Sequence, residues 1–433
     1  MLFKFKNLGA IKDAKIEMGN LTIISGKNNT GKTYLTYAIW GVLSRKLTYA
    51  TINSNFFDAI DKVTLASELN AGLTKEVDLK ILKDNFKAEF SDRILQYGKQ
   101  MNKIFDSNEK TFEETSIEGS ISDEEFYEGL DSIYGEVKGS EGFVFSYENI
   151  KNTSFFKFQV EKQTKEIFDK DSLEKCLDFI AYHIFNQNLF ILTAQRDALH
   201  LFKNAINKKA RYTIRNGSND LDKYALPLES QIDFVSDLNK LSKYDSFLKD
   251  TILINEIEKI LGVKYQIHYD SFQIQDANGV ITPAFMASTS VRTLADLHFY
   301  LKHIVQKGDL LMIDEPELNL HPENQIKIAR LLVKLVNSGI KVWITTHSDY
   351  IVKELNNCFM LSNDFAEKEE LMQEYGYTEK DILKKDDIRV YIAHEEGTVE
   401  EVKIDKLGME KTTFDEAIKR FNEVSDSLFD ILG

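Results

Sequence analysis

The segment GKNNTGKT, from Gly26 to Thr33, constrains the fold of this chain more than any other stretch. It follows the apolar run LTIIS, which reads as a buried strand, and it precedes YLTYAIWGVL, where a helix is expected to continue. The spacing G-x(4)-G-K-[ST] is that of a phosphate-binding loop between a strand and a helix. The sequence therefore predicts an α/β nucleotide-binding fold in which this loop holds a triphosphate.

Each residue type in the loop has a physical role. Gly26 and Gly31 let the backbone wrap around phosphate oxygens with its amides pointing inward, and the helix that follows adds its positive end. Lys32 is expected to place its ammonium on the β and γ phosphates of ATP, and the Thr33 hydroxyl is expected to ligate Mg²⁺. The other residues expected to line the nucleotide are Asn28, Asn29, Thr30 and Tyr34.

A second nucleotide-binding signal lies far downstream, in LLMIDEPELNLHP. Asp314 and Glu315 end an apolar strand there, and adjacent carboxylates at a buried strand end need a cation or hydrogen bonds. Asp314 is expected to hold Mg²⁺ through water, and Glu315 to polarise the attacking water as a general base. His347 follows a further apolar strand in WITTHS, where it can contact the γ phosphate and orient that water.

The order of the loop, LLMIDEPE and WITTHS resembles that of ABC-class ATPases. Within these the chain looks like the SMC-like branch, which includes chromosome-repair ATPases and OLD-type phage-defence ATPases. The opening FKFKNLGAIKDAKIEMGNLTIISGKNNTGKT is similar to the start of that branch, and DEPELNLHP is similar to its OLD-type and bacterial-defence members. The resemblance covers residues 1–46 and 190–362 well, and the rest weakly.

The resemblance implies a signature segment, which in this family opens a helix that reaches the γ phosphate of a partner subunit. The match is ASTSVRTLADL, with Ser288 at the signature serine and Arg292 at the basic position after it. Thr289 and Ser290 replace the two glycines of the family, and their hydroxyls could still donate to phosphate at a helix N-terminus. The alternative is a plain N-capped helix.

The family also implies a Q-loop, which links the nucleotide and its Mg²⁺ to the arm. Gln195 in ILTAQRDAL is the candidate, and a solvated strand end is the alternative. The resemblance further implies that two ATPs lie between two heads of a homodimer or higher homo-oligomer. Each site would join the loop, Asp314, Glu315 and His347 of one chain to residues 288–292 of another.

We expect an ABC-type ATPase head with a mixed sheet flanked by helices, interrupted by a mainly helical arm or lid. Residues 1–46 and 189–362 are predicted to form the two halves of the head. Residues 47–188 are predicted to be the insertion, and residues 363–433 an accessory segment. Within the insertion, GFVFSYE and SFFKFQVEKQ have the two-residue period of a hairpin.

Composition narrows the functional classes. The net charge is −15, with 54 basic and 69 acidic residues, which argues against a uniformly basic nucleic-acid-binding surface. The two cysteines, Cys176 and Cys358, are too far apart to suggest a clustered zinc site. No apolar run reaches about 18 residues, and the N-terminus lacks the apolar centre of a signal peptide. A cytoplasmic protein without a membrane partner is expected.

The resemblance implies an ATPase that senses a phage product or nucleic acid and controls a separately encoded effector, a nuclease or toxin. The residues after NNCFMLSND are too few for the TOPRIM nuclease domain of OLD nucleases. The alternatives are a DNA repair or maintenance ATPase stimulated by nucleic acid and a module in which ATP is a structural ligand. One basic cluster, in KNAINKKARYTIRNG, could contact nucleic acid or be a solvated helix face.

Overall fold

The computed structural model describes residues 1–44, 61–72, 74–78, 80–126, 134–138, 143–149, 155–162, 169–174, 176, 188–202, 205, 224–248, 252–268, 271–410 and 415–432. The chain divides into two compact units. The smaller comprises Met1–Lys4, Gly41–Gln100 and Thr115–Gln187. The larger comprises Phe5–Trp40, Met101–Glu114 and Asn188–Gly433. The basic cluster at 203–215 lies almost entirely outside the described residues, and none of its lysines and arginines is described.

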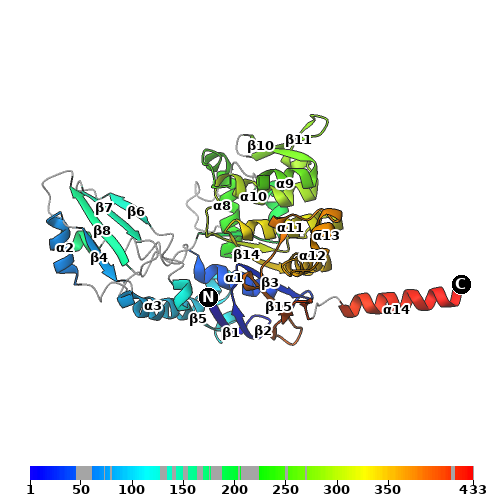
Figure 1. Ribbon diagram of the computed structural model, residues 1–433, viewed down its shortest axis with the longest axis horizontal. Coiled ribbons are helices and arrows are strands. Elements are labelled where there is room, and N and C mark those ends of the chain that lie inside the picture. The colour runs from blue at the N-terminus through cyan, green and yellow to red at the C-terminus, as the bar shows by residue number, and fades with distance from the viewer. Residues whose placement is uncertain are drawn as a thin grey trace. The chain divides into compact units, whose positions relative to one another are not determined.

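The larger unit is built on a six-stranded mixed sheet in the order β16-β15-β3-β14-β13-β9. Figure 1 labels β14, β3 and β15 of this sheet. The five strands from β15 to β9 run parallel, and β16 pairs antiparallel with β15 at one edge. In chain order these strands are β3 (Leu21–Gly26), β9 (Leu189–Leu192), β13 (Leu310–Asp314), β14 (Lys341–Thr346), β15 (Ile388–Ala393) and β16 (Val399–Glu401).

Alternation along the central strands divides the core into two layers. Val342 and Ile344 of β14, together with Leu311 and Ile313 of β13, face the core that they share with the helices between residues 226 and 360. Trp343 points the other way, and its indole Nε1 donates to Thr36 Oγ1 of α1 (Lys32–Leu43) at 2.9 Å. Because both faces of these strands are covered, they read as continuous apolar runs in the sequence.

The larger unit also contains smaller sheets and further helices. Strands β1 (Leu2–Leu8) and β2 (Ile11–Glu17) are adjacent in a second sheet, and a third sheet has the order β10-β11-β12. The other elements are α4 (Met101–Ile104), η3 (Glu109–Phe112), α8 (Leu226–Leu241), α9 (Ile252–Leu261), β10 (Val263–His268), β11 (Ser271–Asp276), β12 (Ile281–Pro283), η4 (Ala284–Met286), α10 (Thr289–His303), α11 (Pro322–Asn337), α12 (Asp349–Met360), α13 (Lys368–Glu374), η5 (Glu379–Asp381), η6 (Lys385–Asp387), β17 (Ile404–Asp405), β18 (Gly408–Met409) and α14 (Asp415–Leu432).

The smaller unit combines helices with a four-stranded antiparallel sheet in the order β4-β8-β7-β6. The predicted hairpin is present, since Phe143 to Asn149 pair antiparallel with Phe156 to Lys162. The sequence EVDLKILKDNFKAEF has helical spacing, but its first residues belong to a strand, Lys75–Asp78, that pairs antiparallel with β8, and the helix begins only at Lys80. The elements are α2 (Lys62–Asn70), β4 (Lys75–Asp78), α3 (Lys80–Gly98), β5 (Ser116–Ser120), β6 (Tyr134–Lys138), β7 (Phe143–Asn149) and β8 (Phe155–Lys162).

The C-terminal segment contributes to the main sheet. Within IRVYIAHEEGTVEEVKI, strands β15 and β16 pair as an antiparallel hairpin. Strand β15 also pairs in parallel with β3, the strand that leads into the phosphate loop, with Ala393 opposite Gly26. Strand β15, which lies within the segment that we expected to be accessory, therefore runs beside the strand that leads into the nucleotide loop. Within the described residues, no helix has the length and apolar character needed to cross a membrane.

Candidate nucleotide site

Four segments of the larger unit meet at one edge of the main sheet. The loop from Gly26 follows β3, Asp314 ends β13, His347 follows β14, and Gln195 follows β9. These strands are parallel, so their carboxyl ends lie at the same edge. In open α/β sheets this edge is where ligands bind. The topology therefore brings together segments that are more than 300 residues apart in the sequence.

The phosphate loop has the backbone that a cradle requires. Gly26 has a φ of 152° and Gly31 a φ of 91°, both in the region that favours glycine. A Cβ at Gly26 would approach the Ala393 carbonyl oxygen to 2.6 Å, and a Cβ at Gly31 would approach Ile11 Cδ1 to 2.7 Å. Any other residue at either position would strain the loop or push its neighbours away, so both glycines are explained by the geometry.

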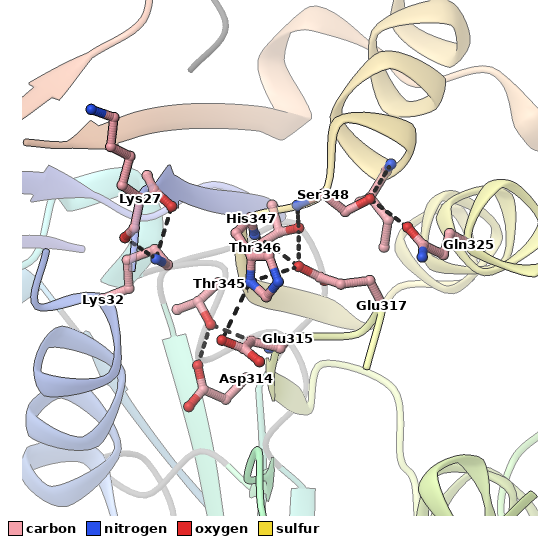
Figure 2. A network of polar contacts seen from close by, with 12 residues as sticks. Lys27, Lys32, Asp314, Glu315, Glu317, Gln325, Thr345, Thr346, His347 and Ser348 are labelled. Carbon is pink, nitrogen blue, oxygen red and sulfur yellow. Dashed lines mark hydrogen bonds and ion pairs between the residues drawn. The ribbon is translucent and has the colours of Figure 1, made fainter. Parts of the chain in front are cut away.

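Lys32 begins α1 and is buried against its own loop. Its ammonium donates to the carbonyl oxygens of Gly26 at 2.9 Å and Lys27 at 2.7 Å (Figure 2). Burial lowers the pKa of Lys32, and the nearby carboxylates of Glu315 and Asp314 oppose that shift. Among the described residues its ammonium hydrogen-bonds to neutral carbonyls, and a buried cation of this kind is suited to a strongly anionic ligand, which a triphosphate would supply.

Thr33 and Asp314 form the expected pair of oxygen ligands. Thr33 Oγ1 donates to Asp314 Oδ2 at 3.0 Å, and Thr345 Oγ1 donates to the other carboxylate oxygen. Burial raises the pKa of Asp314, and these two hydroxyl bonds counter that rise. Mg²⁺ prefers oxygen ligands, is bound through one or two carboxylates, and takes the rest of its shell from phosphates and water. The pair fits that ion.

Thr33 offers a direct test of this pair. Because Thr33 is exposed while Asp314 is buried, Thr33→Ala should leave folding intact and remove one oxygen ligand. We expect the Mg²⁺ concentration for half-maximal ATP hydrolysis to rise at least about tenfold, measured by Mg²⁺ titration at saturating ATP. Thr33→Ser keeps the hydroxyl and serves as the control. Equal Mg²⁺ dependence in Thr33→Ala and the parent would exclude Thr33 as a ligand.

Glu315 is held in an unusual backbone conformation. Its φ is 55°, in the left-handed region, which costs about 1–3 kcal/mol for a residue other than glycine. Its amide donates to the Thr345 carbonyl at 3.0 Å. His347 Nδ1 lies 3.4 Å from Glu315 Oε1, and this polar contact lowers the pKa of Glu315 and raises the pKa of His347. The Glu315 carboxylate is therefore kept ionised. It is half-exposed and lies beside the His347 imidazole.

Glu317 is a site residue that we did not anticipate from the sequence. It is 6% exposed, and its Oε1 accepts from Thr346 Oγ1 and from the His347 amide, both at 2.8 Å (Figure 2). His347 Nδ1 also lies 3.4 Å from this oxygen. Burial raises the pKa of Glu317, and the two accepted bonds oppose this. Glu317 thus ties the segment after β13 to the loop that carries His347.

The predicted signature segment begins α10. Ser288 is the N-cap, with a φ of −61° and a ψ of 157°, and its hydroxyl accepts from the Val291 amide at 3.4 Å. Ser288 Oγ also lies 3.0 Å from Ser290 Oγ. The Arg292 side chain is buried and turns back to the Ala287 carbonyl, and Arg292 Nε has no hydrogen-bond partner among the described groups. The structure thus contains the capped helix that we gave as the alternative.

Other predicted residues lie around the site with fewer contacts. Asn28 and Asn29 are exposed in the loop, and Thr30 is buried and donates to the Lys27 carbonyl at 2.9 Å. The Tyr34 ring packs near Phe105, with centroids 5.2 Å apart. Gln195 is exposed, and its Oε1 lies 3.5 Å from Tyr37 Oη, without a contact to Asp314.

The fold and this site define an α/β ATPase with a phosphate-binding loop. Residues 2–352 match the model of the AAA ATPase domain family, and the chain belongs to that family. It hydrolyses ATP, as the sequence predicted. None of the curated proteins matches the sequence.

Solved SMC heads align along most of the chain at low similarity. The head of an Smc protein bound to the C-terminal winged-helix domain of ScpA is 10% identical, with a TM-score of 0.35 over 93% of this chain and 96% of that chain. The SMC head domain from Thermotoga maritima is 11% identical, with a TM-score of 0.29 over 93% and 98%. The Pyrococcus furiosus Smc head bound to the C-terminal domain of ScpA is 10% identical, with a TM-score of 0.33 over 98% of each chain.

Proposed function

We propose that this ATPase is an SMC-like, OLD-like ABC ATPase that dimerises through its nucleotide sites. The N-terminus of α10 carries this proposal. Ser288 and Ser290 form hydrogen bonds only within the first turn of α10, as far as the described residues go. Ser288 is exposed and Ser290 half-exposed. A helix N-terminus that carries solvent-accessible hydroxyls suits an anion, and in the proposed dimer that anion is the γ phosphate held by the partner chain.

The residues of one chain would then have separate tasks. Lys32 binds the β and γ phosphates, Thr33 and Asp314 hold Mg²⁺, and Glu315 accepts a proton from the attacking water. His347, whose Nδ1 lies between two carboxylates, orients that water and the γ phosphate. Mg²⁺ held by Thr33 and Asp314 would neutralise phosphate charge during hydrolysis. Binding of ATP would close the dimer and hydrolysis would open it, a two-state change controlled by the γ phosphate.

We further propose that this cytoplasmic dimer is the sensor of an antiphage system with a separately encoded effector, a nuclease or toxin. The similarity of DEPELNLHP to OLD-type and bacterial-defence ATPases supports this role, as an analogy of family rather than of site chemistry. The trigger would be a phage protein or nucleic acid. Cells carrying this gene and its neighbouring reading frame should resist phage, and Lys32→Ala should remove the resistance.

A repair or maintenance ATPase makes a different prediction, which the same protein can test. Its hydrolysis should rise with DNA and lose that stimulation steeply as salt increases. We expect the defence ATPase to protect cells only together with its effector. Strong DNA stimulation with no protection in cells would favour the repair function instead.

A further inference from the structure

Arg196 is a buried cation at the centre of the site, and the sequence suggested no role for it. It follows Gln195 in the turn after β9 and is 1% exposed. The Arg196 guanidinium donates four hydrogen bonds, and every acceptor is a backbone carbonyl. Nη1 donates to Thr193 O at 2.9 Å and Asp314 O at 2.7 Å, Nη2 to Glu315 O at 2.6 Å, and Nε to Thr293 O at 3.2 Å.

Two of these bonds fix the peptide units on both sides of Glu315. The Glu315 amide is already held by Thr345, and Arg196 holds the Asp314 and Glu315 carbonyls. A left-handed residue persists only where its surroundings over-determine it. Because the direction of a side chain follows from its backbone, Arg196 helps to set where the Glu315 carboxylate points.

The remaining bonds connect this strand end to α10. Arg196 Nε reaches the carbonyl of Thr293, in the second turn of the helix that Ser288 caps. Asn319 Nδ2 donates to Thr293 Oγ1 at 3.2 Å, so the segment after β13 meets the same residue. The guanidinium therefore joins the end of β9, the end of β13 and α10.

We propose that Arg196 is a positioning residue that holds Glu315 in its catalytic orientation. It also fixes the position of Glu315 relative to α10. The proposal rests on the proposed role of Glu315 as the base. Only a planar fork with five donors can reach carbonyls on three segments at once. Lysine keeps the charge but presents a compact ammonium, so it cannot replace all four bonds.

The test compares Arg196→Lys and Arg196→Met with the parent. We expect kcat for ATP hydrolysis to fall about 100-fold in both, because a displacement of about 1 Å can cost that much. The Kd for a fluorescent ATP analogue should stay within about threefold of the parent, because none of the four bonds goes to the phosphate loop. Arg196→Met is included in case Arg196→Lys does not fold, because methionine buries no unpaired charge.

Arg330→Lys is the matched control. Arg330 also binds carbonyls, those of Tyr375 and Gly376, but it does so on α11 together with Glu354. We expect Arg330→Lys to keep the parent kcat. An equal loss of kcat and nucleotide affinity in the Arg196 variants would overturn the proposal. So would failure of both to fold while Arg330→Lys folds, since Arg196 would then serve stability alone.

A double-mutant cycle separates this proposal from the assignment of the base. If Arg196 acts through Glu315, then Arg196→Lys should lower residual hydrolysis by less than about twofold in a Glu315→Gln background. A full 100-fold loss in that background would contradict the proposal. Parent-like hydrolysis by Glu315→Gln alone would instead contradict the proposed base. The Arg196 single variants would still show whether Arg196 affects kcat.

Discussion

Lys32→Ala is expected to lower ATP hydrolysis by about 10²–10³-fold and to weaken ATP binding, measured by steady-state phosphate release and nucleotide titration. The reason is the position of the ammonium, which is buried and donates to the carbonyls of Gly26 and Lys27. A bound phosphate would give the Lys32 ammonium an anionic acceptor in place of these neutral carbonyls. Alanine leaves the loop amides but removes the charge.

Lys27→Ala is the matched control for that result. Lys27 lies in the same loop, but its side chain is about two-thirds exposed and its Nζ lies 3.3 Å from Glu395 Oε1. Exposed ion pairs contribute about 0–1 kcal/mol, so hydrolysis should remain near the parent rate. Similar losses in both variants would show that charge in the loop matters rather than the buried position of Lys32.

Glu315→Gln should have the second large effect. We expect hydrolysis to fall about 10²–10⁴-fold, while ATP binding stays near the parent affinity. Glutamine keeps the size of the side chain and can still contact His347, but it cannot accept a proton from water. The polar contact with His347 lowers the pKa of Glu315, so in the parent this group remains ionised at neutral pH.

The control for this variant is Glu369→Gln on α13, an exposed residue outside the site. It should hydrolyse ATP at the parent rate. Hydrolysis by Glu315→Gln at that same rate would contradict the assignment of the base. A loss of ATP binding in Glu315→Gln would mean that the residue acts on affinity rather than on the chemical step.

Much of the nucleotide site could be predicted from local sequence. The spacing from Gly26 to Thr33 places two glycines where positive φ values are needed, and both values are observed. The apolar runs before Asp314 and His347 indicate parallel strands, whose carboxyl ends meet at one edge. These inferences succeed because each depends on a short segment with one strong physical requirement.

The contacts that tie the site together could not be predicted in this way. Strand β15 alternates like part of an isolated hairpin, yet it pairs with β3, more than 360 residues earlier in the chain. Arg196 and Glu317 look like ordinary charged residues in the sequence, and only the fold shows that both are buried. The left-handed backbone at Glu315 has no glycine to mark it, because the surrounding bonds rather than the residue type maintain it.

The most direct test of the composite site is the mass of Glu315→Gln in solution, measured by light scattering with and without ATP and Mg²⁺. One chain has a mass of 49.9 kDa. Because slow hydrolysis should trap the closed state, we predict that ATP and Mg²⁺ increase the mass of this variant at least to that of a dimer. Lys32→Ala should not respond to ATP. A monomer mass for Glu315→Gln at saturating ATP, with bound nucleotide confirmed, would contradict the shared site.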